Sequence, residues 1–454
     1  MRRYTLLLLW VAVAACSSEL SQPEAQPDTG PSPIHDPLSM PAEPTLDPES
    51  FASVETCVEC HPGHVAEWNQ SAHSLATKDP VWRTLVAVRQ DHLSSMEDQF
   101  CTQCHSAIGT RGGVFVPGFS FDDVSGVSLE GVTCVACHQV VGMERNYNAG
   151  HVLDPTAPMV GGITDPKSSS AHESVGDGLI QSSAFCGGCH DVIENSGLNL
   201  ERGYMEWMQS PDGDTDTTCQ SCHMPSREGE AAVGGPIRTI HDHRWRGVGL
   251  VVRSLFITDE TILAELDQDI DEFLKTSAEI SLDLPHSVYA GNQLDILVHI
   301  ANKISGHKLP TGTTFIRQFW LALSVKDANG TVIYETGHLD DNGDLRNRWS
   351  QLDPFGDSDL ITLGSELLDK DGQPVLFPWL AVEHISRAIP ALHKRAYTLF
   401  PIIPEDVTGP LEVDAALLFR EFPPFLFEAL GADALIPLFK VRTICETKGS
   451  VDVQ

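Results

Sequence analysis

The chain has 454 residues, about three times the length of a typical single domain, so we expect two or more domains. It carries 29 Lys and Arg against 63 Asp and Glu. The formal net charge of −34 excludes nucleic acid as a partner, because the phosphate backbone would repel such a surface. The same charge is compatible with basic protein partners.

The N-terminus predicts export. Residues 1–15 place Arg2 and Arg3 before an apolar run that is about half of the roughly 20 residues needed to cross a bilayer, as in a signal peptide. Small residues directly precede Cys16, a pattern similar to the cleavage site of bacterial lipoproteins, so we expect cleavage there and lipidation of Cys16. Ordinary secretory cleavage that discards Cys16 is the alternative. A lipidated form would be anchored in the bacterial cell envelope, at the outer membrane, facing the periplasm or the outside.

Residues 16–50 predict a Pro-rich, disordered tether. They contain no Lys or Arg and few aromatic or β-branched residues, so they cannot bury enough apolar surface to fold. With Cys16 acylated, this segment would hold the folded part away from the membrane, and its prolines would keep it semi-extended.

Five pentapeptides of the form Cys-x-x-Cys-His occupy residues 51–250, numbered here first to fifth in chain order. Two cysteines with this spacing can each add to one vinyl group of a haem, and the next residue then offers its imidazole to the iron. Each motif therefore predicts one covalently bound haem c with a proximal histidine, five in all. The motifs are Cys57, Cys60, His61; Cys101, Cys104, His105; Cys134, Cys137, His138; Cys186, Cys189, His190; and Cys219, Cys222, His223.

Zinc binding and disulfide formation account less well for the cysteine pairs. Zinc sites combine one such pair with another and do not require a histidine directly after each. Disulfides suit an exported protein but leave the five histidines without a role.

The haems themselves are expected to form much of the interior of residues 51–250, since one motif for about every 40 residues leaves too little chain for a conventional core. We therefore predict a mostly α-helical or irregular domain. A second axial ligand makes an iron suited to electron transfer and less able to bind substrate. The expected distal ligands are His73, His151, His172 and His243, with His64, His92 and His241 left open.

Residues 51–250 resemble the multihaem cytochromes grouped with cytochrome c-554 and the wider hydroxylamine-oxidoreductase-like set. The resemblance implies distal ligation by the histidine of Ser71-x-His73 and by His151, which follows the third motif. Residues 139–142 depart from the Gly-Pro-Gly of that family. The segments that carry the resemblance are Cys57-x-x-Cys60-His61-Pro62, Glu67-Trp68-x-x-Ser71-x-His73, Gly131-Val132-x-Cys134, Gly150-His151, Ser183-x-Phe185-Cys186, Glu206-Trp207-x-x-Ser210-Pro211, Cys222-His223-Met224-Pro225 and His243-x-Trp245-x-Gly247.

The family also contains enzymes. Pentahaem nitrite reductases are similar in haem count and length, but they replace one proximal histidine by lysine, which none of the five motifs here does. We therefore expect an electron carrier. The alternative is a reductase of a small nitrogen or sulfur oxyanion that uses a five-coordinate haem.

The second half of the chain predicts a different architecture. Apolar residues recur at helical spacing within residues 251–280, which predicts a helical linker. Residues 281–454 predict an all-β, immunoglobulin-like sandwich, with Asn329-Gly330 as a hairpin turn and Cys445 as a buried free thiol. The expected strands lie at 294–300, 319–325, 331–335, 397–403, 411–419 and 439–445.

One segment of this second half is expected to reach back to the haems. His307 lies in residues 306–312, a loop between two strands, from which it could bind a haem iron as a distal ligand. Similar Gly-His-x-x-Pro-Thr-Gly segments accompany haem domains in related multihaem proteins, although an ordinary loop histidine is the alternative. We predict an exported, lipid-anchored pentahaem cytochrome that relays electrons to redox partner proteins, as a monomer or an oligomer.

Overall fold

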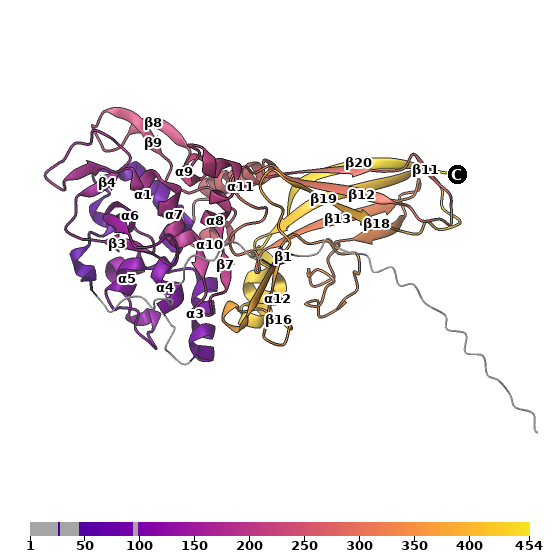
Figure 1. Ribbon diagram of the computed structural model, residues 1–454, viewed down its shortest axis with the longest axis horizontal. Coiled ribbons are helices and arrows are strands. Elements are labelled where there is room, and N and C mark those ends of the chain that lie inside the picture. Colours follow the sequence, from indigo (N-terminus) through magenta and orange to yellow (C-terminus); the bar gives the residue numbers. More distant parts are fainter. Residues whose placement is uncertain (1–25, 28–44, 94–98) are drawn as a thin grey trace, which may run out of the picture.

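The computed structural model describes residues 26–27, 45–93 and 99–454. The predicted signal peptide, the predicted lipidation site Cys16 and most of the predicted tether lie outside these residues. Within them, no helix combines the length and the apolar character needed to cross a bilayer. Figure 1 shows two parts along the long axis, a helical and irregular motif region (residues 45–250) and a β-rich region (residues 278–454).

The helices of the motif region are short because a Cys-x-x-Cys-His motif forms little more than one helical turn. Helices α4, α6, α7 and α9 all end at the histidine of a motif, whereas α1 begins directly after His61. Residues three and four apart lie on the same side of a turn, so the two cysteines and the histidine face one direction. The helices are α1 (Pro62–Asn69), α2 (Ala72–Leu75), α3 (Pro80–Leu93), α4 (Gln99–His105), α5 (Ala107–Arg111), α6 (Cys134–His138), α7 (Ser183–His190), α8 (Gly203–Met208), α9 (Cys219–His223) and α10 (Val251–Ser254).

Two-stranded sheets connect these helices. Three are antiparallel, and the pair β4 and β5 is parallel. They are formed by β2 (Val140–Met143) with β3 (His151–Leu153), β4 (Met159–Gly161) with β5 (Ser174–Gly176), β6 (Val192–Ile193) with β7 (Asn199–Glu201), and β8 (Ser226–Glu230) with β9 (Ile237–His241).

Apolar clusters in the motif region are small. One is built around Phe51, Val135 and Phe185, and another around Val54 and Trp68. Clusters of this size cannot hold a region of this length together by themselves. The structure is thus consistent with an interior that bound haems complete.

Residues 45–50 correct the extent of the predicted tether, because they are folded against the motif region. The backbone N–H groups of Thr45 (2.9 Å) and Leu46 (3.3 Å) donate to the carbonyl of Arg111. The side chain of Leu46 packs beside the cluster around Phe51, and a short 3-10 helix follows at Pro48–Ser50. One leucine and two backbone hydrogen bonds thus order the end of a segment whose composition predicts disorder.

Helix α11 (Glu260–Lys275) lies within the range predicted to link the two regions. Asp259 caps it by accepting the N–H of Thr261, and Leu266, Ile270 and Leu274 are buried on one face. These three leucine and isoleucine side chains belong to the same core as the β-rich region. The helix therefore packs as part of that region and supports the junction.

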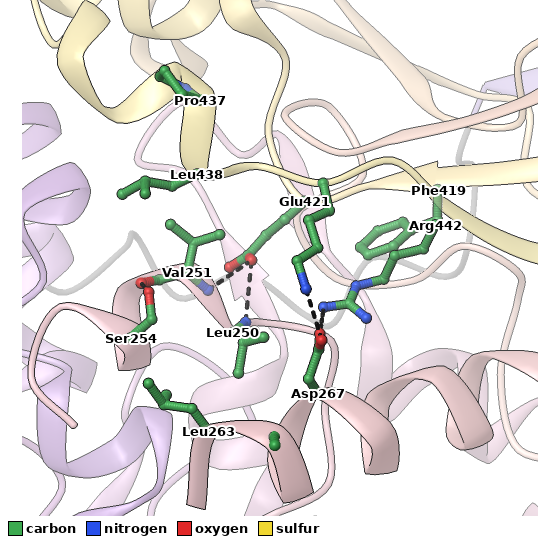
Figure 2. Close-up of a pocket in the computed structure, with 12 residues that line it drawn as sticks. Leu250, Val251, Ser254, Leu263, Asp267, Phe419, Glu421, Pro437, Leu438 and Arg442 are labelled. Atoms are coloured by element: carbon green, nitrogen blue, oxygen red, sulfur yellow. Dashed lines mark hydrogen bonds and ion pairs between the residues drawn. The ribbon is translucent and has the colours of Figure 1, made fainter. Parts of the chain in front are cut away.

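A cavity of about 380 Å³ lies at this junction, between α10, α11 and the start of β20 (Figure 2). Glu421 on its wall accepts the backbone N–H groups of Leu250 (3.2 Å) and Val251 (3.4 Å). Asp267 on α11 pairs with Arg442. The contacts of Glu421 thus join the motif region to the β-rich region, whereas the pair of Asp267 and Arg442 joins α11 to β20.

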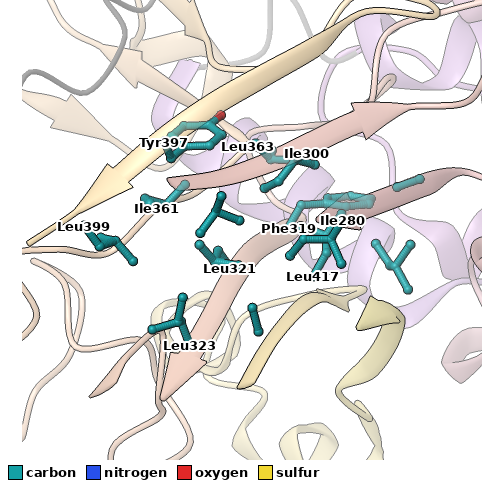
Figure 3. Close-up of a cluster of buried hydrophobic side chains, with 14 of the residues drawn as sticks. Ile280, Ile300, Phe319, Leu321, Leu323, Ile361, Leu363, Tyr397, Leu399 and Leu417 are labelled. Atoms are coloured by element: carbon teal, nitrogen blue, oxygen red, sulfur yellow. The ribbon is translucent and has the colours of Figure 1, made fainter. Parts of the chain in front are cut away.

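Two sheets of the β-rich region share one apolar core (Figure 3). Strand β12 alternates buried and half-buried residues along its whole length, as expected for a strand with one face on a core. The hairpin predicted at Asn329-Gly330 is confirmed by the antiparallel pairing of β13 with β14. The immunoglobulin-like topology stays a prediction. The first sheet has the order β10 (Ala278–Asp283), β12 (Ile296–Asn302), β18 (Lys394–Leu399), and the second has the order β11 (Ser287–Val288), β20 (Arg442–Val453), β19 (Leu411–Arg420), β13 (Gln318–Lys326), β14 (Val332–Thr336).

A third sheet and a helix lie where the β-rich region meets the motif region. Helix α12 (Pro424–Leu430) packs against α3 through Val81, Leu426 and Phe427. The sheet has the order β1 (Gln26–Pro27), β17 (Glu383–Ser386), β15 (Ser365–Leu368), β16 (Pro374–Val375).

Candidate haem sites

Four of the five proximal histidines are oriented by a hydrogen bond from Nδ1 to a backbone carbonyl. A carbonyl oxygen only accepts, so Nδ1 must carry the proton and Nε2 is left with a free lone pair for a metal. The tautomer that binds iron through Nε2 is therefore fixed by the fold. The bonds are His61 to Ala231 (2.6 Å), His105 to Ala76 (2.7 Å), His138 to Val160 (2.6 Å) and His223 to Arg246 (2.6 Å).

Four proximal histidines also face a second histidine. Two imidazoles that bind one metal ion from opposite sides, each through a bond of about 2 Å, have ring centres about 6 Å apart. The observed separations and interplanar angles are 6.3 Å and 23° for His61 and His172, 6.3 Å and 26° for His138 and His243, 6.2 Å and 52° for His190 and His73, and 6.4 Å and 26° for His223 and His307. The first, third, fourth and fifth motifs thus have the geometry of bis-histidine haem sites.

Burial keeps the distal rings neutral, which is the form that binds a metal. Loss of solvent lowers the pKa of His73 to about 4 and that of His243 to about 3. Burial also lowers the pKa of His307. These three rings are therefore uncharged at neutral pH.

The structure brings four of the five predicted distal ligands to a proximal histidine, and His151 is the exception. Within the described residues, its ring contacts Phe185 at 4.8 Å, and its Nε2 donates to the Phe185 carbonyl at 2.8 Å. The reason is local: Asn148 and Ala149 adopt positive φ, and this turn lays His151 flat against α7, where a Cβ on Gly188 would meet the ring at 2.2 Å. The prediction that His151 opposes a proximal histidine finds no support in this arrangement.

The three histidines left open by the sequence have other partners. His92 accepts from the indole N–H of Trp379 at 3.0 Å, and His241 donates to the carbonyl of Met224 at 2.8 Å. His64 lies 3.5 Å from Glu67. These contacts occupy His92 and His241 and place His64 in a small group that includes a distal ligand.

That group consists of His64, Glu67 and His243, whose donor atoms lie within 4.8 Å of one another. Glu67 accepts the backbone N–H of His243 at 3.1 Å, and the ring of His243 faces His138. A carboxylate that accepts the backbone N–H of a ligand helps to hold that ligand in place. We therefore interpret Glu67 as outer support for His243.

The second motif differs from the other four. Within the described ranges, the ring that packs on His105 is that of Trp82, with centres 4.4 Å apart and planes 9° apart. This separation is too short for an iron to lie between the rings, so Trp82 covers the face of the imidazole. The structure thus gives His105 a stacking partner and no second histidine in the part of the chain that it describes.

Unpaired buried polar atoms test whether the motif region fits haem. Arg202 is 4% exposed, and its Nη1 and Nη2 have no hydrogen-bond partner among the described residues. Its Nε lies 3.1 Å from Asp191, directly after the fourth proximal histidine. A buried guanidinium with unused N–H groups is costly, and a haem propionate is an anion that would satisfy it. The residues present therefore fit the cofactor that the motifs predict.

Cysteines of different motifs touch one another. The thiols of Cys57 and Cys134, of Cys104 and Cys189, and of Cys186 and Cys219 lie close enough for each to shift the pKa of the other. All described cysteines are free. The first motif thus adjoins the third, the second adjoins the fourth, and the fourth adjoins the fifth, so groups bound at neighbouring motifs would lie close together.

The loop that carries His307 is held onto the motif region by two acidic residues. Glu206 on α8 accepts the backbone N–H of Lys308 at 3.2 Å and the hydroxyl of Thr311 at 2.6 Å. Asp212 accepts the hydroxyl of Ser305 at 2.7 Å. This anchoring role of Glu206 was missed by sequence reasoning, although the residue stands in a segment that carries the family resemblance.

Comparisons with known proteins agree with this geometry. The sequence family described as cytochrome c554 and c-prime matches residues 56–139, which hold the first three motifs. The search of curated proteins gives no match. Among solved structures, a penta-heme cytochrome c552 from Thermochromatium tepidum has a similar fold, with a TM-score of 0.60 and 20% identity over 89% of this chain and 100% of that one. Residues 56–139 thus match the cytochrome c554 and c-prime family, and the chain shares its fold with a penta-heme cytochrome c552.

Proposed function

We propose that this cytochrome binds five haems c and relays electrons among them. The observation that carries the proposal is that four proximal histidines each face a histidine from a distant part of the sequence, with ring centres 6.2–6.4 Å apart. An iron with two axial imidazoles has both axial positions filled, so it changes oxidation state without binding substrate. Such irons serve electron transfer.

The thiol contacts between motifs support a continuous route. They connect the first motif to the third and the fourth motif to both the second and the fifth. The two groups are joined where Cys137 of the third motif lies close enough to Cys189 of the fourth for its pKa to be raised by that thiol as well as by burial. Cys60 of the first motif and Cys222 of the fifth are exposed. Electrons would therefore enter or leave near these two cysteines. Cys222 belongs to the haem site next to the β-rich region, and Cys60 belongs to a site remote from that region.

The β-rich region, which we propose to be an immunoglobulin-like sandwich, would supply the second ligand of the fifth haem through His307. We further propose that the protein is exported and anchored in the cell envelope through lipid on Cys16. Its net charge of −34 favours redox partners with a basic docking surface.

The test uses the purified full-length holoprotein. A pyridine haemochrome assay with mass measurement should give five haems per chain, and four low-spin signals should dominate its electron paramagnetic resonance (EPR) spectrum. Reduction by one electron donor and oxidation by one acceptor should then proceed through all haems. A colourless protein, or one with the mass of the polypeptide and lipid alone, would overturn the proposal.

A second candidate function rests on the second motif. His105 has Trp82 against its ring and no paired histidine in the described residues. A five-coordinate iron there could bind a small nitrogen or sulfur oxyanion, which would make the protein a reductase fed by the other four haems. A high-spin EPR signal that is lost on addition of nitrite, with turnover of nitrite or sulfite by the reduced protein, would favour this function. Absence of a high-spin signal would exclude it.

A further inference from the structure

The four histidine pairs differ in how their outer nitrogens are satisfied. In three pairs, Nδ1 of both rings has a backbone carbonyl as its partner. The distal bonds are His172 to Glu173 (3.1 Å), His243 to His241 (2.8 Å) and His307 to Lys308 (2.8 Å).

The pair of the fourth motif has no such partners. Nδ1 of His73 is buried without a hydrogen-bond partner, whereas His190 is exposed and its ring is not hydrogen-bonded to another described residue. The indole of Trp245 lies edge-on to His73 with ring centres 4.5 Å apart. The same indole lies edge-on to His243 with ring centres 5.2 Å apart, so the missing carbonyl partner is what sets His73 apart.

An Nδ1–H that donates to a carbonyl makes its imidazole a stronger base, and a stronger base stabilises ferric over ferrous iron. Rings without this bond stabilise ferric iron less, so the reduction potential of their haem is higher.

The charged groups around the fourth motif are mixed. The guanidinium of Arg202 favours the reduced, less positive haem, and its partner Asp191 partly offsets it. Glu201 also interacts with His190, and its carboxylate would favour the ferric haem. Because these charges act in opposite directions, the hydrogen bonding of the ligands is the feature that distinguishes this haem from its neighbours.

We propose that the haem bound through Cys186 and Cys189 has the highest reduction potential of the four bis-histidine haems and collects electrons from its neighbours. The collecting role rests on the proposed relay function. Its position suits that role, because Cys189 contacts the second motif and Cys186 contacts the fifth. Electrons that enter near the exposed Cys60 or Cys222 would reside on the haem of the fourth motif before they pass to the haem of the second motif.

The test is a redox titration of the full-length holoprotein in which each low-spin EPR signal is followed separately. His73→Met should remove the signal that is reduced at the highest potential, because it changes an axial ligand of that haem alone. The matched variants His243→Met and His307→Met should each remove a signal of lower potential. The proposal is wrong if one of these two removes the highest-potential signal and His73→Met does not.

The wild-type protein offers an assignment that does not depend on any variant folding. The rings of His73 and His190 are tilted by 52°, whereas the other three pairs are tilted by 23–26°. The angle between axial imidazole planes sets the g-anisotropy of a low-spin haem, so the fourth motif should give the most anisotropic signal. That signal should be reduced at least tenfold more readily than the others, which is about 59 mV for one electron. If the most anisotropic signal is instead reduced at a lower potential than the others, the proposal is wrong, even if the protein relays electrons. If the protein fails to exchange electrons with a partner, the relay function is wrong, but the order of the haem potentials can still be as proposed.

Discussion

His307 of the β-rich region faces His223 of the fifth motif, with ring centres 6.4 Å apart and planes 26° apart. The two residues belong to different regions of the fold, so ligation of the fifth haem requires that the β-rich region is folded and docked. The loop of His307 is fixed at both ends, since Ser305 binds Asp212 and Thr311 binds Glu206. Haem ligation and the contact between the two regions are therefore coupled.

Removal of the His307 imidazole should open the fifth haem. In His307→Ala, we expect one low-spin EPR signal to be replaced by a high-spin signal, and the reduced protein should bind one additional equivalent of carbon monoxide. The fold should persist, because the loop keeps its contacts to Glu206 and Asp212.

A matched control is His393→Ala in the same region. Its Nδ1 donates locally to the carbonyl of Ala391 at 2.8 Å, so its loss should leave every haem signal unchanged. If His307→Ala also leaves all signals and potentials unchanged, His307 is an ordinary loop histidine.

Glu206 should act as a positioning residue for that ligand. Its side chain is 10% exposed and receives hydrogen bonds from the backbone of Lys308 and the hydroxyl of Thr311. In Glu206→Ala, these donors lose a charged acceptor, which should lower the free energy of unfolding by about 1–3 kcal/mol. We also expect a mixture of high- and low-spin signals at the fifth haem.

Thermal unfolding followed by circular dichroism, together with EPR, measures both effects. Glu412→Ala is a suitable control, because Glu412 is exposed and, among the described residues, forms an ion pair with the exposed Lys448 alone. A Glu206 variant that loses stability but keeps an unchanged fifth-haem signal would limit this residue to a structural role.

Trp82 should control the environment of the second haem. Its ring stacks on His105 at 4.4 Å, and such a contact is worth about 0.5–1.5 kcal/mol. Trp82→Ala should therefore change the carbon monoxide affinity of the high-spin haem by about 2- to 10-fold, while Trp82→Phe should change it less. The four low-spin signals should stay as in the wild type. A change in a low-spin signal instead would show that Trp82 serves a different haem.

The sequence predicts the proximal ligands well because each motif is local. A cysteine pair and the next histidine form one helical turn, so the spacing alone fixes their geometry. The distal ligands are harder, because His172 and His243 reach proximal histidines that lie more than 100 residues earlier in the chain. Only the tertiary fold decides those pairings.

Two further residues show what the sequence does not reveal. His151 matches a family position, yet the turn before it directs its ring toward Phe185. Arg202 stands in no motif, and its importance appears only when its burial and its unused N–H groups are known. In contrast, the alternation along Ile296–Asn302 predicts a strand with one buried face, because period-two patterning is itself the cause of that burial.

The stability of the β-rich region should depend on pH through Asp344. This residue is fully buried, and burial raises its pKa from an ordinary 3.8 to about 6, with a further contribution from Asp340. Between about pH 4 and pH 6, the unfolded chain releases the proton while the folded chain retains it, so rising pH favours the unfolded state. The free energy of unfolding should fall by about 3 kcal/mol across this interval and become level above it.

Comparison with Asp344→Asn isolates this contribution from those of other carboxylates. The amide has nearly the same shape and does not titrate, so the variant should lack the decline that the wild type shows between about pH 4 and pH 6. Asp341→Asn, at an exposed neighbouring position, should keep it. Unfolding by denaturant, followed by circular dichroism at several pH values, measures all three proteins. The prediction is wrong if the free energy of unfolding changes between about pH 4 and pH 6 in the same way in the wild type and in Asp344→Asn. That result would show that Asp344 is ionised in the folded protein, held by the guanidinium of Arg420.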